Sequence, residues 1–199
     1  MKLWPIALAL FAGGVAAGST DLPIPVQNVL TLTDSLPLPV DLDRAFSDHT
    51  SAGLGLAAIA TDNGAIAPAS RNARLHAISA LSTYCEHSPC QDGDTAHKAL
   101  VQIIQDMNGE ATGFDAVVLR AAIEAIGSQR ISSDLDLLVS QLASPSRDIR
   151  AAVAHSLRDL CNTQAIVPLR MQQQTEASEQ VKQAITEALR VLGQGSPCQ

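Results

Sequence analysis

The fold is decided by Ser144-Pro-Ser-Arg-Asp-Ile-Arg-Ala-Ala-Val-Ala-His-Ser-Leu-Arg-Asp-Leu160, a stretch with the pattern of one complete amphipathic helix. Its apolar and small residues recur at helical spacing, at Ile149, Ala152, Val153, Ser156, Leu157 and Leu160. Ser144 is suited to cap the first turn, and Pro145 suits the first helical position, where a missing N–H costs nothing. We therefore expect a helix that begins at Ser144.

The same pattern occurs four times along the chain. Its core, Ile149-Arg-x-Ala-Val-x-x-Ser-Leu157, recurs later from Val181 to Leu189 and earlier from Val118 to Ile126, at a period of about 32 residues. A fourth copy, from Ala73 to Leu81, lies about 45 residues before Val118, which is one repeat plus about 14 inserted residues. Copies at this period predict an all-α array of stacked helical repeats, a solenoid.

These residues resemble the HEAT-repeat family, and their Val-Arg-x-Ala-Ala-x-x-Ala-Leu-Gly form is most similar to the short HEAT-like repeats of phycobilisome lyases. The resemblance covers roughly residues 50 to 193. It implies a right-handed α-solenoid of about four helical hairpins, with a polar ladder between repeats at Arg74, Arg150 and Lys182 that is interrupted at Leu119. It does not imply lyase chemistry, because the repeat is a scaffold with many uses.

Composition narrows the range of functions. Of 199 residues, 46% are hydrophobic but only 3% are aromatic, so one array with a core of Ala, Leu, Val and Ile is expected. The 13 basic and 20 acidic side chains give a net charge of −7. This charge argues against a nucleic-acid partner, because too few cations are present to neutralise phosphates, and favours a basic partner.

Residues 1–18 have the pattern of a secretory signal peptide: Lys2, an apolar run from Leu3 to Ala17, and small residues where a peptidase could cut. If it is not cleaved, the segment would be an anchor, although the run is shorter than the roughly 20 residues of a membrane span. The even count of four cysteines suits an oxidising compartment. Ten Arg against three Lys suits a GC-rich bacterial genome, so we expect a periplasmic or secreted protein without a membrane span after signal cleavage.

Residues 19–50 are rich in Pro and Asp. Prolines at alternate positions fix φ and remove N–H donors, so we expect an extended segment, either a linker or a strap along the first helices. The array then occupies residues 51–199, with an inserted cysteine loop at 85–94 that projects from one edge. The first helix of the array is expected within residues 43–60. The helices expected after it are Ser70–Tyr84, Thr95–Met107, Phe114–Ile126 ended by Gly127, Asp134–Leu142, Ser144–Leu160, Thr163–Gln174 and Glu176–Leu192.

Periodicity separates a polar face of the second helices from their apolar stripe. Its candidate binding residues are Arg120, Glu124, His155, Arg158, Gln183, Glu187 and Arg190. In HEAT-like arrays the second helices line the concave side, so the resemblance implies that this face holds a protein or peptide partner. The alternative is that Arg120 with Glu124, and Glu187 with Arg190, are ordinary ion pairs on solvated helices.

The four cysteines allow two interpretations of the inserted loop. Cys85, His87, Cys90 and His97 supply two thiolates and two imidazoles, the donor set of a tetrahedral zinc site. In an oxidising compartment, however, Cys85 and Cys90 more simply form a disulfide, which is the interpretation that we favour. We also expect Cys161 to pair with Cys198 and tether the carboxyl-terminal tail as a cap on the last repeat.

Catalytic motifs are absent from the sequence: there is no Gly-rich phosphate loop, no Gly-x-Ser-x-Gly elbow and no His-Glu-x-x-His pair. Asp134 and Asp136 are interpreted as charges that the dipole of a helix start favours, and His76 as a packed histidine. The sequence therefore predicts an exported, non-catalytic binding scaffold without a cofactor. The alternative is a zinc-binding protein that uses the cysteine loop, with metal-assisted chemistry.

Overall fold

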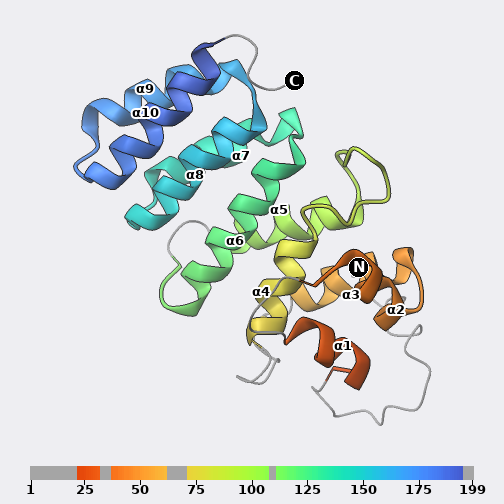
Figure 1. The fold of residues 1–199 in the computed structure, drawn as a ribbon. Coiled ribbons are helices and arrows are strands. Elements are labelled where there is room, and N and C mark those ends of the chain that lie inside the picture. The colour runs from red at the N-terminus through yellow and green to blue at the C-terminus, as the bar shows by residue number, and fades with distance from the viewer. Residues whose placement is uncertain (1–21, 32–36, 62–70, 108–110, 195–199) are drawn as a thin grey trace, which may run out of the picture.

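The structure is a computed structural model that describes residues 22–31, 37–61, 71–107 and 111–194. Every regular element in these ranges is helical (Figure 1). The α-helices are α1 Ile24–Leu30, α2 Pro39–Phe46, α3 His49–Thr61, α4 Arg71–Ala80, α5 Thr95–Met107, α6 Phe114–Gln129, α7 Leu135–Ser140, α8 Arg147–Leu160, α9 Ile166–Thr175 and α10 Glu179–Gly193. Within the same described ranges, three short 3-10 turns accompany them: η3 Ser132–Asp134, η4 Gln141–Ala143 and η5 Thr163–Ala165.

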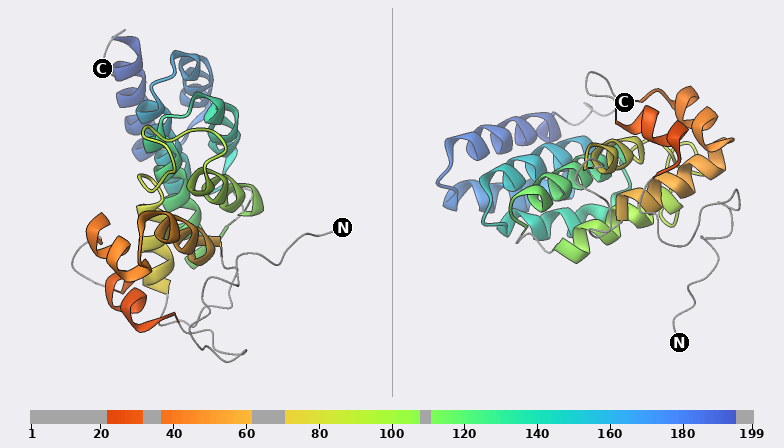
Figure 2. Two further views of the ribbon diagram at one scale, coloured as in Figure 1. Left: turned by 90° about the vertical axis from the view of Figure 1, so that its right-hand side faces the viewer. Right: turned by 90° about the horizontal axis from the view of Figure 1, so that it is seen from below.

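The helices stack as an elongated array, with the amino-terminal and carboxyl-terminal helices at opposite ends (Figures 1 and 2). Each first helix packs against the second helix that follows it: α3 on α4, α5 on α6, α7 on α8 and α9 on α10. The second helices α4, α6, α8 and α10 also pack on one another in sequence, and α3 packs on α5. These contacts confirm the all-α repeat fold that the periodicity predicts.

The core lies along the apolar stripes of the second helices. In α8, Ile149, Val153 and Leu157 are buried, and Val181 and Ile185 occupy the matching positions of α10. Many of their neighbours are alanines, and such short side chains let helix backbones approach closely. The sequence period therefore places the same kind of residue in the core of successive repeats.

The sequence predicts that Gly127 ends α6, but the helix continues to Gln129. It is capped by Arg130, which lies in the left-handed region at φ 58°. The reason for the glycine is packing. A Cβ at Gly127 would lie 2.6 Å from the Cα of Ser156 on α8. The Ser156 hydroxyl in turn donates a hydrogen bond of 2.8 Å to the carbonyl oxygen of Ile123, so α6 and α8 touch here through small and polar groups.

The helix α8 starts later than expected. Its N-cap is Ser146, whose hydroxyl accepts from the backbone N–H of Ile149, rather than Ser144. The following Pro145 disfavours helical geometry at Ser144, which is extended with ψ 138°. Ser178, at the N-cap position of α10, stands one period after Ser146, so this start is part of the repeat.

The prediction that residues 19–50 are extended is wrong for α1 and α2. Pro25 and Pro39 lie in the first turns of these helices, where a missing N–H breaks no helical bond. Val26 and Leu30 are buried, and the Leu30 carbonyl oxygen lies 2.8 Å from Nδ1 of the half-buried His76 on α4. The described part of this segment thus packs on the array, as the strap alternative predicted. It does so as helices and not as an extended chain. Residues 1–18, the expected signal peptide, lie outside the described residues.

Candidate functional site

The second-helix face, defined by the seven candidate binding residues, runs over α6, α8 and α10. Five of the seven side chains are exposed, and Arg158 and Glu187 are half-buried. The helices that carry them are packed side by side, and Gln180 of α10 donates a 3.5 Å hydrogen bond to Asp148 of α8. The structure therefore brings the candidates onto neighbouring helices, while their role in binding stays a prediction.

The charges on this face are mostly paired within their own helix. Arg120 donates to Glu124 at 2.8 Å, and this bond, with a contribution from Asp148, raises the pKa of Arg120. The two bonds from Arg190 lower the pKa of Glu187, with His155 and Arg158 adding to the effect from α8. Exposed pairs of this kind contribute little to stability, because solvent screens them. The face thus presents mixed charges rather than one strong sign.

A buried ion pair joins α8 to the turn before α10. Arg150 donates to both carboxylate oxygens of Glu176, at 2.8 and 2.7 Å, and to the carbonyl oxygen of Ser144 at 2.8 Å. The Glu176 side chain is only 1% exposed, and the bond from Arg150 outweighs burial and lowers its pKa to about 2. The expected polar ladder is therefore present at Arg150.

Sequence reasoning misses this role of Glu176 because it counts the residue as the first of the expected helix Glu176–Leu192, whereas α10 begins at Glu179. The signal that could have found it is its place one period after Ser144. Both residues are buried directly before a second helix, and both contact Arg150. The earlier ladder position behaves differently. Arg74 is buried and donates from Nε to the carbonyl oxygen of Ala60 at 3.0 Å, which joins α4 to α3 within one repeat.

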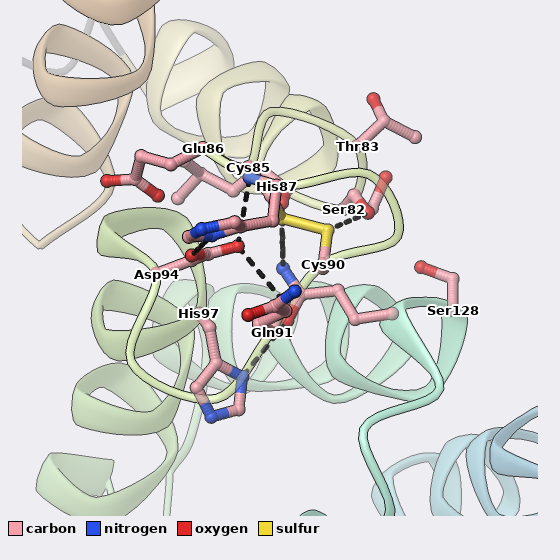
Figure 3. The surroundings of a disulfide bond; sticks show 12 residues. Ser82, Thr83, Cys85, Glu86, His87, Cys90, Gln91, Asp94, His97 and Ser128 are labelled. Atoms are coloured by element: carbon pink, nitrogen blue, oxygen red, sulfur yellow. Dashed lines mark hydrogen bonds and ion pairs between the residues drawn. A yellow bond between two sulfur atoms is a disulfide. The ribbon is translucent and has the colours of Figure 1, made fainter.

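The inserted loop is closed by the predicted disulfide between Cys85 and Cys90, with their Cα atoms 5.3 Å apart (Figure 3). Bonded sulfurs are not thiolates, the form in which cysteine binds zinc. His87 and His97 also do not converge on them, because each has other partners. Among the described residues, no group of three or more His, Cys, Asp or Glu is placed to hold a metal ion.

Asp94 holds the loop from inside. Its buried carboxylate lies 2.6 Å from Nδ1 of His87 and accepts the backbone N–H of Gln91 at 3.0 Å (Figure 3). Burial acts to raise the pKa of Asp94, but the bonds from Gln91 and His87 outweigh it and leave the pKa below its usual value. Nearby, the Glu86 carboxylate accepts the backbone N–H of Thr95 and caps the start of α5.

His97 belongs to a buried polar cluster instead of a zinc site. Its Nδ1 lies 3.1 Å from Oε1 of Gln129 on α6, and its Nε2 lies 3.4 Å from Asp92 and 3.5 Å from Asp134. Burial raises the pKa of Asp134 to about 6, His97 opposes this, and Asp92 adds to it. Asp134 and Asp136 thus both stand at the start of α7, as expected, but Asp134 is buried at the N-cap position, whereas Asp136 is exposed in the first turn.

The second predicted disulfide is only half within the described residues. Cys161 follows α8 in the left-handed region, at φ 59°, and its N–H donates to the carbonyl oxygen of Arg158. Cys198 lies outside the described residues, so this pairing stays a prediction.

The repeats match a known family. Residues 98–190 fit the family model of HEAT repeats. This range runs from α5 to α10 and includes the whole second-helix face and the Arg150–Glu176 pair. No curated protein and no solved structure is significantly similar to the chain. In the part of the chain that the structure describes, no helix is both long and apolar enough to span a membrane.

Proposed function

We propose that this protein is an exported, non-catalytic scaffold that holds another protein or a peptide on its second-helix face. HEAT repeats commonly serve as scaffolds for protein interactions, and the match to them covers this face. The observation that carries the proposal is the row of packed helices α6, α8 and α10 with exposed polar side chains of both charges. Stacked repeats give an extended surface of this kind, which suits a polypeptide better than a small substrate.

The architecture we infer is a right-handed solenoid of four hairpins, α3–α4, α5–α6, α7–α8 and α9–α10, with the second helices on the concave side. In this arrangement His155 on α8 stands at the centre of the face, between the α6 pair of Arg120 with Glu124 and the α10 pair of Glu187 with Arg190. A partner would therefore contact several repeats at once.

The address we propose is the periplasm or the outside of the cell, with the partner in the cell envelope. The signal-like residues 1–18 and the Cys85–Cys90 disulfide both suit export to an oxidising compartment. The net charge of −7 makes nucleic acid an unsuitable partner.

Affinity capture from an envelope extract tests the face. The bait is the full chain, and the variant combines Arg158→Glu with Arg190→Glu on α8 and α10. The matched control is Arg170→Glu, which reverses an exposed charge on α9, outside the face. We expect the double variant to lose a partner, by tenfold or more in quantitative mass spectrometry, that the control retains. If all baits capture that protein equally, the proposed face is wrong.

A further inference from the structure

A small pocket lies at the amino-terminal end of the array, away from the second-helix face. Its volume is about 110 Å³, and its walls come from the start of α3, the inserted loop and the first residue of α5. The lining residues are His49, Thr50, Gly53, Leu54, Tyr84, Cys85, Glu86 and Thr95. Pockets for drug-sized molecules begin at about 300 Å³, so this one fits a single side chain rather than a cofactor.

The walls of the pocket are held in place by interactions with several elements. The His49 ring stacks on Tyr84 with centroids 4.5 Å apart, and its Nδ1 lies 3.2 Å from Asp43. The single O–H of Tyr84 is shared between Asp43 and the carbonyl oxygen of Pro39, which ties α2 to the wall. On the other side the Cys85–Cys90 disulfide closes the loop. A preorganised wall lowers the entropy that binding must overcome.

The chemistry of the lining favours a cation. Glu86 extends from the loop on the side away from Cys90 (Figure 3). Its carboxylate accepts one backbone N–H, from Thr95, and a carboxylate has about four acceptor positions, so capacity remains. Gly53 and Tyr84 both line the pocket; Gly53 presents no side chain, and a Cβ there would lie 3.7 Å from the carbonyl oxygen of Tyr84. Thr50 and Thr95 add hydroxyl groups that also accept hydrogen bonds.

The net negative charge of the chain is concentrated in residues 1–110, the part that carries the pocket. Residues 1–110 contain 11 acidic and 5 basic side chains, whereas residues 111–199 contain 9 and 8. Six of the seven net negative charges therefore belong to the half that carries the pocket. Such a field attracts a basic ligand and raises its rate of association.

We infer that this pocket receives the lysine or arginine side chain of a partner polypeptide, with Glu86 as its counter-ion. It is an anchor point separate from the second-helix face, and it does not depend on that face. A partner bound along the array would insert one basic residue between α3 and the disulfide loop.

Titration of the full chain with short peptides, followed by NMR, tests this inference. The probes are Gly-Lys-Gly and Gly-Arg-Gly, with Gly-Gln-Gly as the neutral control, at low ionic strength. We expect the basic peptides to shift the amide signals of Gly53, Glu86 and Thr95 saturably, and 0.5 M salt to weaken this binding. Equal shifts with Gly-Gln-Gly would overturn the inference. Shifts confined to α6, α8 and α10 would also overturn it and would assign basic-peptide binding to the second-helix face.

Two variants and a control make the test specific. Glu86→Gln should weaken Gly-Lys-Gly binding by up to about fivefold, the range of an exposed ion pair. Gly53→Ala narrows the pocket. The added methyl group makes only an ordinary 3.7 Å contact and improves helix propensity, so weaker peptide binding by this variant cannot reflect unfolding. Asp106→Asn removes an exposed charge elsewhere on α5 and should leave binding unchanged. Unchanged binding in both pocket variants would contradict the inference.

Discussion

Small residues determine how closely the second helices approach one another. Between α6 and α8 the contact is made by Gly127 and Ser156, and a methyl group on Gly127 would collide with the backbone of α8. Backbone cannot move aside as a flexible side chain can. The Ser156 hydroxyl also uses this proximity to reach the carbonyl oxygen of Ile123. One missing side chain therefore sets the spacing of two repeats.

Gly127→Ala should consequently destabilise the protein. Overpacking a core costs about 1–3 kcal/mol, whereas the better helix propensity of Ala returns at most about 1 kcal/mol, so we expect a net loss of about 1 kcal/mol. Chemical denaturation followed by circular dichroism measures it. The control is Gly193→Ala at the end of α10, where no heavy atom lies within 4 Å of the added Cβ. Equal stability of the two variants would show that the α6–α8 contact tolerates a methyl group.

At the scale of elements, the sequence predicts best those helices whose apolar stripe is complete. The period that begins at Ile149 locates α6, α8 and α10, and α5 is predicted with its observed bounds. By contrast, the sequence pattern misses α1 and the start of α2, because their prolines suggest broken helices rather than helix starts. What makes these helices form is contact with α3 and α4, including the burial of Leu30. A local pattern does not report such contacts.

The candidate site likewise has a part that local sequence patterns predict and a part that depends on contacts between distant residues. Helical spacing is enough to place the seven residues of the second-helix face on neighbouring helices, and the expectation of an oxidising compartment is enough to favour the Cys85–Cys90 disulfide. The partners of His97 cannot be found from the sequence, because Gln129 and Asp134 lie far from it along the chain. Neither belongs to a periodic stripe, so only the packing of α5 against α6 brings the cluster together.

The Arg150–Glu176 pair predicts how the joint between α8 and α10 responds to acid. The folded pKa of Glu176 is lowered from 4.5 to about 2, which corresponds to roughly 3 kcal/mol of stability. Because the folded value is the lower one, this contribution is complete above pH 4.5 and is lost as the pH falls towards 2. Glu176→Gln should therefore lower stability at pH 7 by about 3 kcal/mol and flatten its decline below pH 4.5.

Urea denaturation at several pH values between 7 and 2 makes this measurement. Glu179→Gln is the matched control, since it changes an exposed glutamate in the first turn of α10. Its stability should decline with pH as in the unaltered chain. A parallel decline in Glu176→Gln as well would mean that the buried pair contributes nothing to acid sensitivity.

At the scale of the whole molecule, an array of repeats has two ends that need protection. The amino-terminal end is covered by α1 and α2, which pack on α4 and α3. At the other end α10 is the last helix in the part of the chain that the structure describes, and we expect the tail to cover it through a disulfide between Cys161 and Cys198. Closing this loop of roughly 38 residues is worth about 4 kcal/mol in the chain-entropy model.

Cys198→Ser should therefore lower the stability of the oxidised protein by up to about 4 kcal/mol and leave that of the fully reduced protein unchanged. The same loss is expected for Cys161→Ser, and the double variant should lose no more than either single one, because all three lack the same bond. Peptide mapping without reductant identifies the pair directly. A free Cys198 thiol in the oxidised protein, or losses that add in the double variant, would show that the two cysteines act separately and that the last repeat is stabilised without a tethered tail.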